Sequence, residues 1–180
     1  MLKEICEEGW SSERLQFKKL SLKDRDDMYE YTSDVECCRF LKWGPHKSID
    51  ETELFIKKVI RTYVNPSDVL FGIRLTCEDK LIGVIRIYNI IDKNADISYI
   101  LNPNYSGVGY MTEAVNSMIA LCFEKLKLDS VNAYYAEGNV RSEKVMKRTG
   151  MIQDKDYETF EMIKDTKVRI YKYRIEKREV

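Results

Sequence analysis

The stretch of sequence that decides the fold reads Ala95-Asp-Ile-Ser-Tyr-Ile-Leu101-Asn-Pro-Asn104-Tyr-Ser-Gly107-Val-Gly109-Tyr-Met-Thr-Glu113-Ala114. Its first part alternates like a strand, and Asn102-Pro103 ends that pattern. From Gly109 the apolar residues recur at helical spacing as far as Leu126. The segment therefore predicts a strand, a tight glycine-containing loop and a long helix in immediate succession.

The loop has the properties of an anion-binding site. Gly107 and Gly109 let the backbone turn tightly and approach a ligand closely. The N–H groups free at the helix start would belong to Gly107, Val108, Gly109, Tyr110 and Met111. The helix dipole adds about half a positive charge at this end, which suits a phosphate or pyrophosphate. A glycine turn that only starts a helix gives the same local pattern, so the loop alone leaves both interpretations open.

Further elements are predicted on both sides of this segment. Upstream, the patterns favour a strand over Glu13–Leu20, helices over Asp24–Ser33 and Asp50–Thr62, and strands over Val69–Thr76 and Leu81–Ile90. Downstream, they favour a strand over Ser130–Glu137, a helix over Val140–Arg148, and a hairpin of Tyr157–Ile163 with Lys167–Ile175. Ser48 and Glu51 match a capping box at the second helix, and Gly150 matches a C-terminal helix cap.

This order of elements predicts one mixed sheet. The strand–helix–strand unit from Ala95 to Glu137 predicts a parallel pair, whereas the hairpins predict antiparallel neighbours. A length of 180 residues fits a single domain, with its core over about residues 13–176. We therefore expect an α/β (α+β) domain with a mostly antiparallel sheet and helices on both faces.

Composition excludes several classes of function. Thirty Lys and Arg balance thirty Asp and Glu, and this zero net charge argues against a generic binder of nucleic acids or anionic membranes. No apolar run approaches the roughly 20 residues that span a membrane, and the first residues lack the apolar core of a signal peptide.

The cysteines and the single histidine narrow the chemistry further. The five cysteines show no CxxC spacing, which indicates reduced thiols in a cytoplasmic protein. His46 is the only histidine, so a zinc site with two histidines is excluded and we expect no metal.

Two motifs together resemble the GNAT superfamily of N-acetyltransferases. The first is the loop with Gly107 and Gly109, followed by Thr112-Glu113-Ala114 in the helix. The second is the later segment that contains Asn139, Ser142 and Gly150. The chain is most similar to the branch that includes the ribosomal-protein N-terminal acetyltransferases, over about residues 14–173.

The sequence departs from that branch at a few positions. Asn104 stands where the branch has Gln or Arg, and Ser106 stands where a bulky residue is usual. Asp96-Ile-Ser-Tyr99 stands where the branch commonly has Glu-Ile-Gly-Tyr.

The resemblance implies a fold in which the strand before the loop and the strand after its helix splay apart. It implies acetyl-CoA as co-substrate, with the pyrophosphate on the amides from Gly107 to Met111 and with Asn104 beside them. The pantetheine arm would lie along the backbone of Tyr99, Ile100 and Leu101 and would contact Asn139 and Ser142. A backbone N–H of that strand would also donate to the thioester oxygen as charge develops.

The resemblance also implies direct attack of a primary amine on the thioester. Asp96 and Glu137 are the candidate bases, because both lie on strands beside the expected splay. Ser142 matches the position that faces the departing sulfur. The alternatives stay open: each carboxylate could be solvated at a strand end, and Ser142 could be an ordinary first-turn serine.

Two functions from different classes follow. The favoured one is acetyl-CoA-dependent N-acetylation of a protein N-terminus or a small-molecule amine. This function is compatible with a homodimer. The alternative is a module of the same fold that binds CoA or acetyl-CoA with little catalysis, because Asn104, Asp96 and Ser98 depart from the branch.

Overall fold

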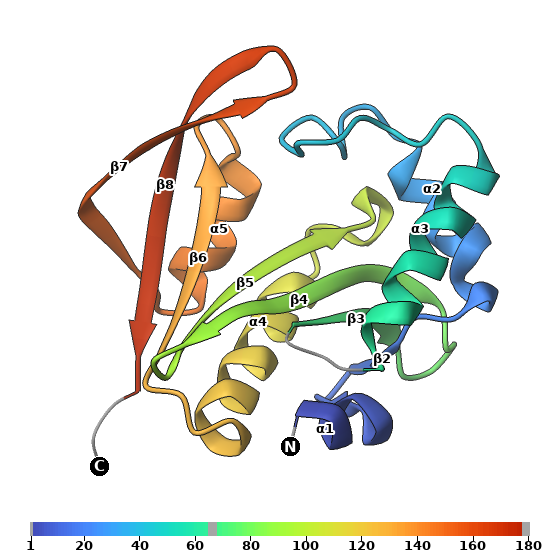
Figure 1. The fold of residues 1–180 in the computed structure, drawn as a ribbon, viewed down its shortest axis with the longest axis horizontal. Coiled ribbons are helices and arrows are strands. Elements are labelled where there is room, and N and C mark those ends of the chain that lie inside the picture. Colours follow the sequence, from blue (N-terminus) through green and yellow to red (C-terminus); the bar gives the residue numbers. More distant parts are fainter. Residues whose placement is uncertain (1, 65–67, 178–180) are drawn as a thin grey trace.

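A computed structural model describes residues 2–64 and 68–177 of the chain (Figure 1). Its strands are β1 (Trp10–Ser11), β2 (Leu15–Lys19), β3 (Val69–Leu75), β4 (Leu81–Ile91), β5 (Asn94–Leu101), β6 (Ser130–Ala136), β7 (Ile152–Ile163) and β8 (Thr166–Glu176). Its α-helices are α1 (Leu2–Glu8), α2 (Arg25–Thr32), α3 (Ile49–Thr62), α4 (Tyr110–Ala120) and α5 (Val140–Arg148).

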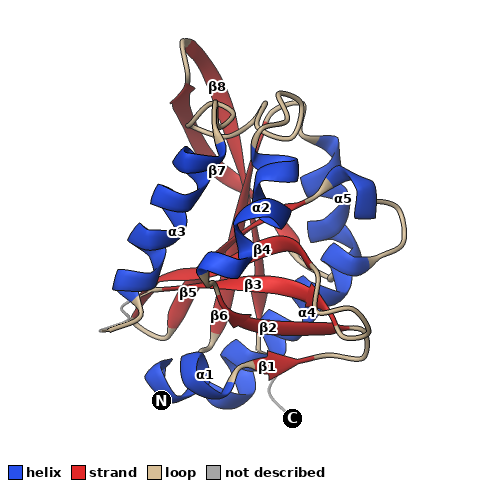
Figure 2. Cartoon of the chain, turned by 90° about the vertical axis from the view of Figure 1, so that its right-hand side faces the viewer, coloured by secondary structure: helices blue, strands red, loops and turns tan. Residues whose placement is uncertain are grey.

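The strands form one sheet in the order β1-β2-β3-β4-β5-β6-β8-β7. Neighbouring strands run antiparallel except β5 and β6, which form the predicted parallel pair around α4. Figures 1 and 2 show α2 and α3 on one face of this sheet and α4 and α5 on the other. The predicted mixed sheet with helices on both faces is confirmed.

The β5–β6 pair separates partway along its length. The ladder begins at Asn94 opposite Ser130 and ends at Ile97 opposite Ala133. Beyond that point β5 stays paired with β4 as far as Leu101, and β6 stays paired with β8 as far as Ala136. The two strands therefore leave unpaired backbone facing the gap between them, which is the splay that the resemblance implied.

The core explains why the strand and the helix flanking the glycine loop hold their positions. Ile97 of β5 and Ile85 of β4 are almost fully buried, and so are Val115 and Met118 of α4. These side chains come from the alternating positions of the strands and from one stripe of the helix. Burying them fixes the start of α4 against the end of β5.

The structure differs from the sequence-based expectations at several ends. Helix α1 and strand β1 were not predicted, since seven and two residues give too short a periodic signal. Strand β7 begins at Ile152 rather than Tyr157. The sequence pattern missed residues 152–156 because they are mostly polar, which an edge strand tolerates. Helix α4 continues into a π-helical turn over Leu121–Lys125.

The predicted capping box at α3 is only half right. The Ser48 hydroxyl accepts from the Glu51 N–H, as expected. The Glu51 carboxylate, however, accepts from the N–H of Lys47 at 2.7 Å instead of returning to Ser48. Both side chains therefore still accept from backbone N–H groups at the start of α3, but the Glu51 carboxylate uses the N–H of Lys47.

Candidate active site

The glycine loop adopts a conformation that favours glycine at two positions. Gly107 and Gly109 both have φ of +89°, in the left-handed region. Gly109 directly precedes α4, and its carbonyl accepts from the Glu113 N–H at 3.0 Å. A Cβ placed on Gly107 would meet no atom within 4 Å, so the loop borders open space. Open space and free helix-start amides are what an anionic ligand needs.

A charged network ties the loop to the short segment between β1 and β2. Glu113 accepts from the Arg14 Nε at 2.6 Å, the Arg14 N–H at 2.8 Å and the Ser12 hydroxyl at 2.7 Å. Burial opposes ionisation of Glu113, but these bonds outweigh it and lower the pKa of its carboxyl. Arg14 also donates from Nη1 to the Val108 carbonyl at 3.2 Å. The sequence interpretation did not single out Arg14, because its partner lies 99 positions away.

Tyr99, Asn139 and Ser142 meet beside the splay. The Tyr99 hydroxyl lies 3.1 Å from the Ser142 hydroxyl and donates to the Ser142 carbonyl at 3.2 Å. The Asn139 side chain accepts from the Ser142 N–H at 3.3 Å and caps α5. Burial raises the pKa of Tyr99 to about 12, so its hydroxyl stays protonated near neutral pH. The sequence pointed only to the backbone of Tyr99, and its hydroxyl is an addition from the structure.

Asp96 is buried in a polar cluster on the opposite face of the sheet. Its carboxylate accepts from the Asn89 side chain at 2.9 Å, from the Asn132 side chain at 3.0 Å and from the Tyr134 hydroxyl at 3.4 Å. Burial, together with the negative charge of Asp96, raises the pKa of the neighbouring Tyr88 to about 12. Asp96 is thus held in place by neutral donors, one residue before the last position at which β5 pairs with β6.

The second candidate carboxylate lies elsewhere. Glu137 directly follows β6, is exposed, and accepts from the Tyr171 hydroxyl at 3.0 Å. Glu137 lies in the turn after β6, and its partner Tyr171 stacks on Tyr135 with the ring centroids 5.1 Å apart. Alternation along β6 places Tyr135 on the face opposite to Asn132, the partner of Asp96. Asp96 and Glu137 therefore lie on opposite faces of the sheet and do not converge on one point.

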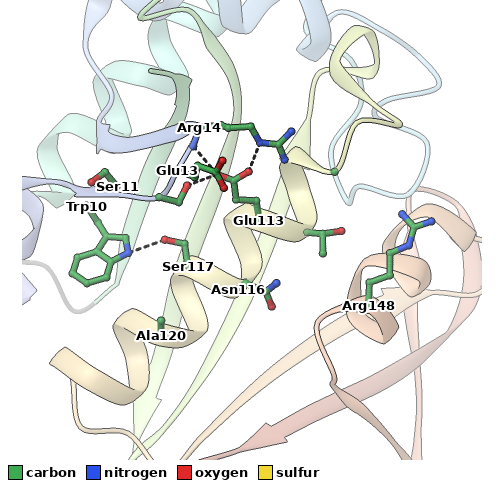
Figure 3. Close-up of a pocket in the computed structure, with 12 residues that line it drawn as sticks. Trp10, Ser11, Glu13, Arg14, Glu113, Asn116, Ser117, Ala120 and Arg148 are labelled. Atoms are coloured by element: carbon green, nitrogen blue, oxygen red, sulfur yellow. Dashed lines mark hydrogen bonds and ion pairs between the residues drawn. The ribbon is translucent and has the colours of Figure 1, made fainter. Parts of the chain in front are cut away.

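A cavity of about 780 Å³ lies along α4 beside the glycine loop (Figure 3). It is lined by Trp10, Ser11, Ser12, Glu13, Arg14, Gly109, Thr112, Glu113, Asn116, Ser117, Ala120 and Arg148. The Trp10 indole donates to the Ser117 hydroxyl at 2.7 Å along the wall of this cavity. In the described part of the chain, no group of three or more His, Cys, Asp or Glu residues could hold a metal ion.

The sheet has one parallel pair, β5 and β6, that splays apart, and a glycine loop joins β5 to α4. This combination is typical of the N-acetyltransferase fold. A family model for the acetyltransferase (GNAT) domain matches residues 14–152. The chain belongs to this family, and it is an acyltransferase.

Two curated relatives agree with this assignment, and a solved structure shares the fold. The uncharacterized N-acetyltransferase YnaD of Bacillus subtilis is 30% identical over 144 residues, which is 78% of this chain and 81% of YnaD. YdaF of the same organism, provisionally named a ribosomal N-acetyltransferase, is 26% identical over 79% of this chain and 80% of its own. The microcin C7 self-immunity acetyltransferase MccE, solved with acetyl-CoA and AMP, has a TM-score of 0.81 at 18% identity, covering 92% and 93% of the two chains. No helix in residues 2–64 and 68–177 is long and apolar enough to cross a membrane.

Proposed function

We propose that the protein transfers the acetyl group of acetyl-CoA to a primary amine. The observation that carries this proposal is the splay of β5 from β6 immediately before the glycine loop of α4. The splay offers unpaired backbone to the amides of a pantetheine arm, and the loop offers N–H groups to a pyrophosphate. These two features lie in consecutive segments of the chain, as one extended ligand requires.

The residues divide the binding of acetyl-CoA between them. The amides of Gly107, Val108, Gly109, Tyr110 and Met111 would hold the pyrophosphate, with Asn104 at the edge of the loop. The backbone of Tyr99, Ile100 and Leu101 would hold the pantetheine arm. The side chain of Asn139 would contact the same arm while it caps α5.

In the proposed reaction, groups on one face of the sheet assist the leaving thiolate and a carboxylate on the other face accepts the amine proton. The neutral amine nitrogen forms a bond to the thioester carbon, and the carbonyl oxygen takes up the negative charge beside a backbone N–H of β5. The carbon–sulfur bond then breaks, and the hydroxyls of Ser142 and Tyr99 donate to the departing thiolate. Asp96, on the opposite face, accepts the amine proton directly or through a water molecule. Glu137 is the second candidate base, although it lies on the face of Tyr99.

The acceptor is proposed as a protein N-terminus or a small-molecule amine. The name of YdaF supports the first class, and a complex of MccE with AMP supports acceptors beyond proteins among proteins of this fold. All five cysteines are free thiols, which suits the cytoplasmic setting that we propose for the reaction.

Turnover against a panel of amines tests the proposal. We expect purified protein to release free CoA thiol from acetyl-CoA only when a suitable amine or N-terminal peptide is present. Acetylated product, identified by mass spectrometry, should match the thiol released mole for mole. Tight binding of acetyl-CoA without turnover of any acceptor would instead support the binding module and contradict the proposed reaction.

A Tyr99→Phe substitution should separate catalysis from binding. The variant loses a hydroxyl that bonds to Ser142, so kcat should fall about tenfold while the KM for acetyl-CoA changes less than twofold. Since the pKa of Tyr99 is raised to about 12, the wild-type rate should show no loss from its ionisation below pH 10.

The matched control for this variant is Tyr63→Phe. Tyr63 also carries a buried hydroxyl, which is hydrogen-bonded to the Leu70 carbonyl, but it lies at the end of α3. Its loss should lower the melting temperature and leave kcat within twofold. Equal kinetic effects of the two variants would show that the Tyr99 hydroxyl has no part in the reaction.

A further inference from the structure

We infer that Arg14 binds the pyrophosphate of acetyl-CoA and supplies the cation that the glycine loop itself lacks. This inference rests on the proposed function, since it concerns the same co-substrate. The loop from Asn104 to Met111 contains no Lys or Arg side chain. Its amides alone would then face a group with two negative charges, so a cation contributed from elsewhere in the chain would improve binding.

Arg14 is the cation that the fold brings to the loop. Its Nη1 donates to the Val108 carbonyl, and its Nη2 lies 3.6 Å from the position of a Cβ on Gly109. The centre of its guanidinium lies 4.7 Å from the centroid of the Tyr110 ring, in the first turn of α4. Figure 3 shows the guanidinium beside this turn, at the upper end of the cavity.

Part of the guanidinium is free for a ligand. A guanidinium has five N–H donors in a planar fork. In Arg14 the Nε is taken by Glu113 and one Nη1 donor by Val108, whereas Nη2 has no partner among the residues that the structure describes. The Arg14 side chain as a whole is 43% exposed, which leaves room for a ligand beside it.

Glu113 orients this fork rather than competing for all of it. Its Oε2 accepts from the Arg14 Nε, which fixes the guanidinium plane, and its Oε1 accepts from the Ser12 hydroxyl and the Arg14 N–H rather than from Nη2. A pre-oriented guanidinium loses less conformational freedom when it binds phosphate. Arg14 thus links the segment between β1 and β2, the glycine loop and the proposed ligand.

Truncated forms of the co-substrate test the inference. CoA and 3′-dephospho-CoA both carry the pyrophosphate, and pantetheine carries no phosphate. We expect Arg14→Gln to weaken calorimetric binding of CoA and of 3′-dephospho-CoA about tenfold or more. Inhibition by pantetheine, measured as a competitor, should change less than twofold. Arg14→Lys should restore part of the lost affinity, because it keeps the charge but not the fork.

Two control variants separate direct contact from indirect effects. Glu113→Gln removes the carboxylate but keeps the Arg14 charge, so its effect on CoA binding should be clearly smaller than that of Arg14→Gln. Arg148→Gln removes an equal charge from the α5 side of the same cavity (Figure 3). It should weaken 3′-dephospho-CoA less than Arg14→Gln does. Melting temperatures of all variants would show that each is folded.

The possible outcomes distinguish this inference from the proposed function. Equal weakening of pantetheine and CoA in Arg14→Gln would mean that Arg14 only supports the loop, and would overturn the inference. So would an equal effect of Arg148→Gln or of Glu113→Gln on 3′-dephospho-CoA. Unchanged CoA binding in Arg14→Gln, beside normal turnover of the wild type, would overturn the inference alone. A wild type that binds no CoA would overturn the proposed function with it.

Discussion

Replacing both Gly107 and Gly109 by glutamate should weaken CoA binding by at least about a hundredfold. Both positions have φ of +89°, which costs a residue with a Cβ roughly 1–2 kcal/mol each. The new carboxylates would also stand where the loop amides are proposed to meet the pyrophosphate, and like charges repel. Isothermal titration calorimetry with CoA measures the loss, and thiol release should disappear with it.

Gly150→Glu is the matched control for this double variant. Gly150 follows α5 with φ of +76°, and a Cβ there would approach only Ile175 of β8, at 4.0 Å. The substitution therefore adds the backbone strain of one such position and one new charge away from the loop. It should lower the melting temperature and leave the Kd for CoA within about threefold. CoA binding that survives in the double glutamate variant would mean that the glycine loop is only a turn.

Replacing Asp96 by asparagine should lower kcat/KM for the amine by about a hundredfold. A positioned base typically contributes this much or more, and an amide cannot accept the amine proton. The substitution also places an amide opposite the Asn89 and Asn132 donors, so some stability should be lost as well. Thermal melting separates this loss from the kinetic effect, and the KM for acetyl-CoA should stay within threefold.

The pH profile gives a sharper test of the same role. Raising the pH supplies more hydroxide, which can take the proton of the attacking nitrogen in place of Asp96. The difference between wild type and Asp96→Asn should therefore shrink as the pH rises from 6.5 toward 9. A ratio that stays constant across this range would argue that Asp96 acts through structure alone.

Glu137→Gln is the comparison that assigns the base. Glu137 is exposed and lies on the other face of the sheet from Asp96, so we expect less than a threefold loss in kcat/KM. A larger loss in Glu137→Gln than in Asp96→Asn would reverse the assignment. Because the two side chains do not converge, the fold-losses of the two single variants should multiply in the double variant.

Local sequence signals predicted the part of the site that is formed by neighbouring residues. Gly107 and Gly109 predicted a tight turn before a helix, and both residues adopt the left-handed backbone conformation that such a turn needs. Asn139 and Ser142 were expected to contact the same ligand, and Asn139 caps the helix start by accepting the Ser142 N–H. These features depend on φ preferences and on hydrogen bonds that span three residues or fewer, and such preferences are readable from residue types.

Long-range pairing decided the rest. The bond between the hydroxyls of Tyr99 and Ser142 joins residues 43 positions apart, and the Arg14–Glu113 pair joins residues 99 positions apart. The opposite faces of Asp96 and Glu137 follow from the register of β5 on β6 and from the contact of Glu137 with Tyr171 of β8. The sequence by itself determined the family, the mixed sheet and the glycine loop, because periodicity and backbone preference are local properties. Only the tertiary structure decided which charged and hydroxyl groups meet, because that depends on sheet order and strand register.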